Sequence, residues 1–311
     1  MSAGGTVVEV GLLGKVAVSG GGGEVGLGPD RQRCVLAALA VDAGRVVSVA
    51  RLTERVWGAT PPLRARGTLL SYLSRLRHAV AGVEGVDVVR RPGGYALEVD
   101  RAAVDLHRFR DLRARARASD DHHAAALLSE ALGLWRGEAL TGVGGDWAAA
   151  ERARLDRERL DAECELTDAR LRLGHGEELV PGLAVRAAES PLDERVAAQY
   201  VLALYRAGRT ADALAHYRAV RERLVDELGA DPGPALQDVH RRVLTGEPAL
   251  TPGPATGAVT GAVTGAATGP VTGAATGPVT GPATGPATGA ATGPADDERA
   301  RERRPEDRAL G

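Results

Sequence analysis

The chain has 311 residues, and 44% of them are hydrophobic but only 3% aromatic, so aliphatic side chains and alanine must fill its cores. A chain of this length is expected to form about two domains. Its net charge of −2 excludes a protein that is strongly basic over its whole surface. No stretch reaches the ~18 apolar residues of a membrane span, and Met1–Gly11 lacks the features of a signal peptide. We therefore expect a cytoplasmic protein without membrane contact.

The charges are distributed unevenly along the chain. Residues 1–101 carry 13 basic and 9 acidic side chains, a net charge of +4, whereas residues 102–245 carry 21 and 25, a net charge of −4. A locally basic first third can provide a face that binds phosphate groups.

The first third begins with short β-type runs that are separated by glycines. Together they predict a small antiparallel sheet, formed by Thr6–Val10, Gly14–Val18 and Glu24–Leu27. A helix is predicted next, over Asp30–Val41, because its apolar residues recur at helical spacing.

Two more helices and a hairpin complete this part. Ser48 is a natural N-cap for a short helix that ends at Trp57. Thr60-Pro61-Pro62 interrupts the chain before a third helix over about Leu63–Val80. Two β runs, Val86–Arg91 and Tyr95–Val99, then flank Pro92-Gly93-Gly94, which is a hairpin signal.

Residues 105–245 are predicted to be almost continuously helical and contain an internal repeat. Gly174 and Gly208 lie 34 residues apart in similar surroundings, and this is the tetratricopeptide period. Each glycine separates two amphipathic helices, and Ser190-Pro191 is predicted to start the helix between them, with serine as the cap. Such helix pairs stack into a solenoid because they cannot bury their apolar faces alone.

The last part of the chain has low complexity. Ten tandem tetrapeptides run from Pro254 to Gly293, each with alanine or proline first and Thr-Gly last. Their glycine and proline content predicts a disordered tether. The predicted fold is therefore mainly α with a small β component. It comprises a winged helix-turn-helix domain (1–101), an all-α tetratricopeptide-like repeat domain (102–245) and a disordered tail (246–311).

The third helix carries the candidate DNA-binding residues. At about 100° per residue, its leucines gather on one narrow arc and its hydroxyl, phenol and guanidinium groups on another. The polar arc comprises Arg64, Thr68, Ser71, Tyr72 and Arg75. A helix with this face fits the major groove, where arginine pairs with guanine and threonine or serine contacts a base edge.

Two flanking groups extend this candidate interface. Arg77 lies toward the flank of the helix and is better placed for a phosphate. Arg90 and Arg91 lie at the tip of the hairpin, from which arginine can reach the adjacent minor groove. The pattern of the helix alone also fits a solvated face. Its position after a short helix and a turn, and before a hairpin, favours a winged helix-turn-helix.

Motifs across both domains resemble the SARP family, the antibiotic regulatory proteins of actinomycetes. Three segments resemble its winged-helix domain: Val46–Gly58, Thr68–Arg77 and Arg91–Tyr95. Four more resemble its bacterial transcriptional activator domain: Val104–Phe109, Ala131–Gly137, Ala203–Arg209 and Glu227–Pro234. The resemblance covers about residues 9–245.

The resemblance implies a transcription activator that binds double-stranded promoter DNA. Such proteins bind direct repeats near secondary-metabolite gene clusters, often as head-to-tail dimers, and contact RNA polymerase and its sigma factor. Two positions depart from the family, which usually has Asn and Gln where this chain has Gly67 and Leu70. Losing these polar groups is expected to alter base preference or to weaken binding. The family does not predict the repeat tail.

Other functions have less support. A helical-repeat adaptor that binds a protein partner instead of DNA is the main alternative. We expect no enzyme, cofactor or metal, because Gly20–Gly23 lacks the lysine of a phosphate-binding loop and His122-His123 fits a solvated helix start. The residues themselves do not distinguish an activator from a repressor.

Overall fold

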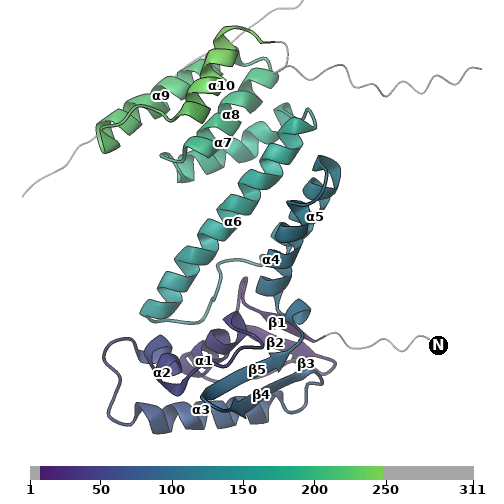
Figure 1. Ribbon diagram of the computed structural model, residues 1–311, viewed down its shortest axis with the longest axis vertical. Helices are drawn as coiled ribbons and strands as arrows, with labels where there is room; N and C mark the ends of the chain where they lie inside the picture. Colours follow the sequence, from purple (N-terminus) through teal and green to yellow (C-terminus); the bar gives the residue numbers. More distant parts are fainter. Residues whose placement is uncertain (1–7, 248–311) are drawn as a thin grey trace, which may run out of the picture. The chain divides into compact units, whose positions relative to one another are not determined.

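The computed structural model describes residues 8–247, which are mostly helical, with two small β structures in the first hundred residues. Figure 1 shows the strands beside the first three helices, followed by the helices of the second region. This arrangement confirms the predicted fold class for the described residues. The predicted disordered tail lies, from residue 248 onward, outside them.

The first sheet has three short antiparallel strands, β1 (Glu9–Gly11), β2 (Ala17–Gly20) and β3 (Gly23–Glu24). Val10 pairs with Val18, and both are fully buried. The third strand is shorter than predicted and ends at Glu24. The chain then turns through Gly28, at a φ of +76°, into the first helix.

Three helices follow: α1 (Asp30–Val41), α2 (Val49–Trp57) and α3 (Ala65–Val80). The bounds of α1 match the prediction. The Ser48 hydroxyl caps α2, as predicted, by accepting a hydrogen bond from the Arg51 N–H at 3.2 Å. Helix α3 begins at Ala65, two residues later than predicted. Its apolar stripe is buried as the spacing predicted, and it consists of Ala65, Leu69, Leu73, Leu76 and Val80.

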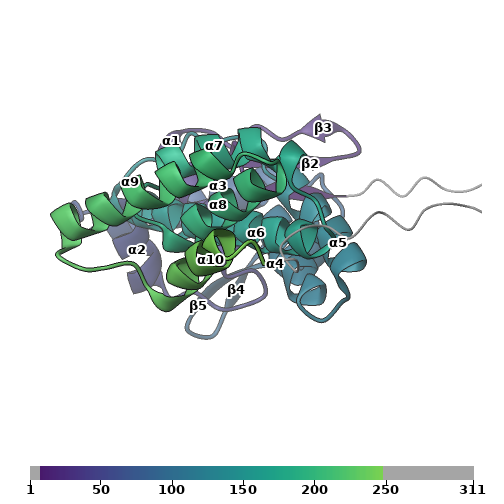
Figure 2. The same cartoon turned by 90° about the horizontal axis from the view of Figure 1, so that it is seen from above.

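The predicted hairpin is present as β4 (Val86–Arg91) and β5 (Gly94–Val99), with Arg91 paired to Gly94 at the tip. Pro92 and Gly93 form the two-residue connection, and Gly93 has a φ of +91°, which favours glycine. Figure 2 shows this hairpin, the wing, projecting beyond the neighbouring helices. The wing is therefore open to a partner that approaches α3.

The second region contains the short 3₁₀ helices η1 (Arg101–Ala103) and η2 (Glu177–Leu179) together with longer α-helices. These are α4 (Asp105–Ala116), α5 (Asp121–Gly133), α6 (Asp146–Arg172), α7 (Val180–Glu189), α8 (Glu194–Arg206), α9 (Thr210–Leu228) and α10 (Pro234–Leu244). Gly174 and Gly208 turn the chain between helices at φ values of +93° and +74°, which confirms the predicted helix pairs.

One predicted helix start is wrong. Ser190 ends α7 instead of capping the next helix, and Pro191 lies in the turn. Helix α8 begins at Glu194, and the Asp193 carboxylate accepts hydrogen bonds from the N–H groups of Arg195 and Val196, both at 3.0 Å. A carboxylate that accepts two N–H bonds supplies the cap that the prediction assigned to serine.

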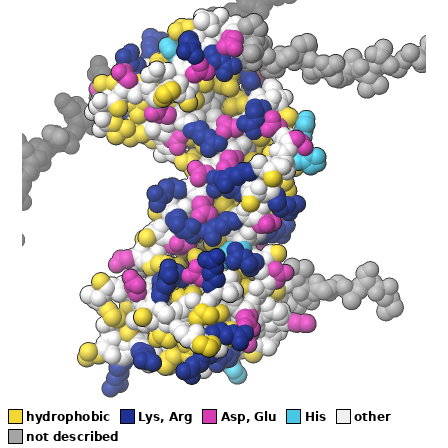
Figure 3. All heavy atoms as spheres, in the orientation of Figure 1, with side chains coloured by type: hydrophobic (Ala, Val, Ile, Leu, Met, Phe, Trp, Pro, Cys, Tyr) yellow, Lys and Arg dark blue, Asp and Glu magenta, His cyan; other side chains and the backbone are white. Residues whose placement is uncertain are grey.

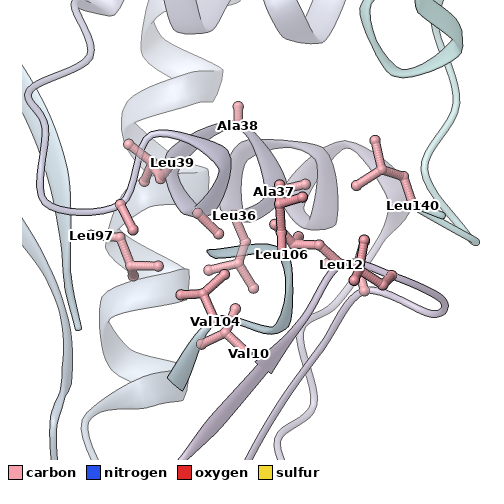
Figure 4. Packing of buried hydrophobic residues seen from close by; sticks show 14 of the residues in the cluster. Val10, Leu12, Leu36, Ala37, Ala38, Leu39, Leu97, Val104, Leu106 and Leu140 are labelled. Atoms are coloured by element: carbon pink, nitrogen blue, oxygen red, sulfur yellow. The ribbon is translucent and has the colours of Figure 1, made fainter. Parts of the chain in front are cut away.

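The described residues pack into two main hydrophobic cores. The first core contains buried residues from Val10 in β1 to Ala169 in α6. The second contains buried residues from Leu171, near the end of α6, to Val243 in α10. Figure 4 shows residues of the first core from both predicted domains, including Leu36 of α1 and Leu106 of α4. The domain boundary at residue 101 stays a prediction from the sequence, because this core extends on both sides of it.

Both cysteines, Cys34 and Cys164, are buried. Burial raises the pKa of the Cys34 thiol to about 12 and that of the Cys164 thiol to about 11. Since the thiolate is the reactive form, both thiols are inert at neutral pH.

Asp105 connects the first sheet to α4. It begins α4, as predicted, and its buried carboxylate accepts hydrogen bonds from the backbone N–H groups of Leu12 (2.8 Å), Leu13 (3.0 Å) and Leu106 (2.7 Å). Burial raises the pKa of Asp105 to about 6, although these three N–H groups favour the charged form.

Candidate nucleic-acid interface

Helix α3 is held by its leucines, so its opposite side faces outward. The outward side carries Arg64, Gly67, Thr68, Ser71, Tyr72 and Arg75, which together line a shallow groove of about 510 Å³. The structure thus brings together the five residues that helical spacing assigned to the polar arc, with Gly67 among them. Arg64, Ser71 and Arg75 are exposed, whereas Thr68 and Tyr72 are half-buried.

These side chains differ in their contacts with the rest of the protein. The hydroxyls of Thr68 and Ser71 donate to the carbonyls of Arg64 and Gly67, both at 3.2 Å. Each hydroxyl oxygen keeps lone pairs with which it can accept a bond from a base amino group. The Tyr72 ring stacks on Trp57 of α2, with centroids 6.3 Å apart, and so fixes α3 against α2.

Arg77 forms a hydrogen bond with the wing. Its Nε donates to the carbonyl oxygen of Val88 in β4 at 2.8 Å, which ties the flank of α3 to the hairpin. The side chain therefore aligns α3 with the wing. A phosphate contact by Arg77, which the sequence predicts, would have to use its other guanidinium nitrogens.

The wing presents the two predicted arginines at its exposed tip. Arg91 forms an ion pair with Glu98 across the hairpin, whereas no ion pair involves Arg90 within residues 8–247. Gly94 lies against the backbone before α2, where a Cβ atom would overlap the carbonyl oxygen of Val47. Val47 and Tyr95 exchange backbone hydrogen bonds of 2.8 and 3.0 Å, so the wing is anchored to the start of α2.

A second cleft, of about 590 Å³, lies between α3 and the wing. From α3 it is lined by Arg66 and Leu70, and from the wing by Arg90–Tyr95. The sequence analysis did not include Arg66 among the candidate residues. Its helical angle places it away from the predicted polar arc. The sequence gives no signal for the side of α3 on which the wing lies.

The pairing of charges differs between this surface and the contact of α4 with α6. Arg64, Arg66, Arg75 and Arg90 form no ion pair with any carboxylate of the described part of the chain. By contrast, arginines of α4 and its C-cap pair with carboxylates of α6: Arg110 with Glu158 (2.9 Å), Arg113 with Glu165 (2.9 Å) and the C-cap Arg117 with Glu165 (2.7 Å). Figure 3 shows dark-blue side chains along the edge where Figure 1 places α3, and blue and magenta interleaved over α4–α6.

Exposed guanidinium groups without a carboxylate partner suit a polyanion. Each carries a full positive charge and fixed donors that match phosphate or the guanine edge. Together with the hydroxyls of α3 and the projecting wing, they form a surface suited to a DNA groove and its flanking phosphates.

The described residues offer little for metal chemistry. Within residues 8–247, no group of three or more His, Cys, Asp or Glu side chains is arranged to hold a metal ion. His123 instead contacts the N-cap carboxylate of Asp120 at 2.6 Å, at the exposed start of α5. In the same range, no helix is both long and apolar enough to cross a bilayer.

Comparison with known proteins identifies the family. Residues 104–244 match the bacterial transcriptional activator domain. The chain is 33% identical to the regulatory protein DnrI of Streptomyces peucetius, over 78% of this chain and 94% of DnrI. It is 38% identical to the transcriptional regulator RedD of Streptomyces coelicolor, over 79% of this chain and 73% of RedD. The chain belongs to the SARP family.

This SARP-family chain also has a counterpart of known structure. The solved structure of Mycobacterium tuberculosis EmbR, in complex with a low-affinity phosphopeptide, superimposes with a TM-score of 0.73. The two sequences are 31% identical, and the match covers 79% of this chain and 67% of the EmbR chain. The regulatory protein AfsR of Streptomyces coelicolor is 40% identical over 81% of this chain, but the chain spans only 26% of AfsR.

Family membership confirms the expected class of protein, because the relatives and the matched domain are those of transcriptional regulators. The roles assigned to individual residues of α3 and the wing stay predictions.

Proposed function

We propose that this SARP-family regulator binds promoter DNA sequence-specifically, with α3 in the major groove and the wing tip at the adjacent minor groove. The observation that carries this proposal is the set of uncompensated guanidinium groups around the polar groove of α3. Arg75 pairs with guanine, Thr68 and Ser71 contact base edges, and Arg64 and Arg90 contact phosphates or the minor groove.

The proposal extends to assembly and to targets. The protein binds direct repeats as a head-to-tail dimer, controls a secondary-metabolite or antibiotic gene cluster, and recruits RNA polymerase with its sigma factor. Kinship with regulators such as DnrI and RedD supports this extension. The helical region also exposes apolar side chains suited to protein contact, namely Val225, Leu228 and Leu244.

DNA binding can be tested with the full chain and a library of random duplexes. Sequences that the protein enriches are then titrated by fluorescence anisotropy over a range of salt concentrations. We expect affinity to fall steeply with salt, because each neutralised phosphate releases counterions. Arg75→Ala should cost about 1–3 kcal/mol and relax discrimination at one base position.

Arg218→Ala serves as the matched control, because Arg218 is an exposed arginine of α9 whose Nε donates to the Leu214 carbonyl of its own helix. This variant should bind DNA as the parent protein does. An unchanged affinity and footprint for Arg75→Ala would contradict the assignment of α3. Failure to enrich any duplex, together with capture of a protein partner, would favour the adaptor function.

Activation and target need a second experiment. Chromatin immunoprecipitation locates the genomic sites, and transcript levels after deletion of the gene show the sign of regulation. We expect sites near a biosynthetic gene cluster, two half-sites per footprint, and reduced transcripts in the deletion strain. Increased transcripts would instead identify a repressor.

A further inference from the structure

The cleft between α3 and the wing is lined by both apolar side chains and guanidinium groups. Val49, Leu70, Pro92 and Tyr95 contribute carbon surface, and three arginines also line it: Arg66, Arg90 and Arg91. Apolar and cationic groups in one cleft suit a ligand that has a small hydrophobic group beside negative charges. A duplex groove has both features, since thymine methyl groups project into the major groove between two phosphate backbones.

Leu70 is the centre of this arrangement. It lies on α3 one residue after buried Leu69, its side chain is 40% exposed, and it is the one large aliphatic side chain of α3 that is exposed. Keeping such a side chain in water has a cost that burial against another apolar group would remove. Leucine has no donor or acceptor, so the only base feature it can contact favourably is the thymine methyl group.

Gly67 gives a base access to this part of the helix. It lies almost one helical turn before Leu70, and a Cβ atom built at Gly67 would have no neighbour within 4 Å. The helix surface next to Leu70 therefore lacks a side chain that would hold a base edge away.

The neighbouring charges orient the duplex. Arg66 lies on α3 and Arg90 on the wing, both are exposed, and neither forms an ion pair within residues 8–247. Phosphates drawn to these two groups would bring the groove edge of one base pair to the cleft that Leu70 also lines.

We propose that Leu70 is a specificity-determining residue that reads the 5-methyl group of one thymine in each half-site. This inference rests on the proposed binding of DNA by α3 and assigns part of its sequence preference. A guanine, cytosine or adenine at this position would lose hydrogen bonds to water without gaining a partner on the leucine, so each is disfavoured.

The test uses the duplex enriched by the full chain, with each thymine replaced singly by uracil, which lacks only the methyl group. For the parent protein, one position per half-site should lose about fourfold in affinity on replacement, the equivalent of one buried methyl-sized group. Leu70→Ala should bind the thymine and uracil duplexes equally at that position. Leu70→Gln should shift the preference there toward adenine, because glutamine pairs with the adenine edge.

Val185→Ala is the matched control, because Val185 is an exposed aliphatic residue of α7. Its uracil profile should equal that of the parent protein. An identical profile for the parent protein and Leu70→Ala, on a duplex that both bind specifically, would overturn the assignment of Leu70 alone. Failure of the full chain to enrich any duplex would overturn both this inference and the proposed function.

Discussion

At the residue level, the arginines of the candidate interface have different partners. Arg75 forms no ion pair within the described residues, Arg77 donates to the Val88 carbonyl, and Arg91 pairs with Glu98. The sequence placed all three in one interface, Arg75 and Arg77 by helical spacing and Arg91 by its position at the hairpin tip. It does not report which neighbour the side chain meets.

Two glycines of the interface should respond oppositely to alanine. Gly94→Ala forces a Cβ atom into the Val47 carbonyl oxygen and the Ser48 backbone, and it should lower the free energy of unfolding by about 1–3 kcal/mol. Gly67→Ala places a methyl group in open space on the surface of α3, and it should raise the free energy of unfolding by about 0.5–1 kcal/mol. Urea unfolding monitored by circular dichroism measures both, and equal effects would show that the wing does not approach Val47 closely.

Asp105 should make stability depend on pH. Its folded pKa of about 6 lies above the unfolded value of 3.8, so the folded state holds the proton more tightly. The stability that this confers is complete below the unfolded pKa and is lost as pH rises toward the folded pKa. The loss is on the order of 3 kcal/mol for a shift of about two pH units.

Asp105→Asn removes this titration. Urea midpoints of both proteins between pH 4 and pH 7 should therefore show the parent losing stability relative to the variant, with most of the change below about pH 6. A parent protein that gains relative stability over this range would show that the N–H groups of Leu12, Leu13 and Leu106 lower the pKa instead.

At the scale of elements, the wing carries a charge that opposes its proposed role. Glu98 of β5 neutralises Arg91 across the hairpin. Both side chains are about half exposed, at 51% for Arg91 and 46% for Glu98, so the ion pair contributes little to stability. Its main effect is on the electrostatic potential at the wing tip.

Glu98→Gln should therefore strengthen DNA binding. The substitution frees Arg91 and removes a charge that repels phosphate, and we expect the salt dependence to steepen by as much as one phosphate contact. Anisotropy titrations at several salt concentrations measure both quantities. Glu130→Gln is the control, since Glu130 is a half-exposed glutamate of α5 that pairs with Arg108 of the helical region. Equal affinities for Glu98→Gln and the parent would place the wing tip away from the DNA.

At the scale of the whole described chain, the winged helix and α4–α6 share one hydrophobic core. Further contacts join the two parts. Arg55 of α2 pairs with Asp42 at 2.7 Å and also lies over the Trp147 ring of α6, 5.4 Å from its centroid. The winged helix and the first helices of the activator domain should therefore lose their structure together.

Hydrogen exchange can test this coupling. Phe109 of α4 is fully buried in the first core, and Phe109→Ala should cost about 3–5 kcal/mol. Amides of α3 and β4 should then exchange faster by the same factor as amides of α4. Leu204→Ala, in the second core, should accelerate α7–α10 and leave α3 unchanged. Unaltered exchange of α3 in Phe109→Ala would show that the two parts unfold independently.

The local elements could be predicted from the amino-acid sequence alone. Periodic leucines placed α3, Ser48 placed the start of α2, and the glycines spaced by 34 residues placed the helix pairs, because these signals act between residues close in the chain. It also yielded the outward groove of α3, since helical geometry fixes which side chains share a face.

Features that depend on residues distant in the chain became visible in the folded protein. It showed that Arg66 and Leu70 meet the wing, that Arg77 is engaged by Val88, and that Asp105 binds the backbone of Leu12 and Leu13. It also showed which arginines lack a carboxylate among the described residues. The reason is physical: burial and charge pairing depend on groups that folding brings within a few ångströms, across about 10 to 90 residues of sequence, and no local pattern records those distances.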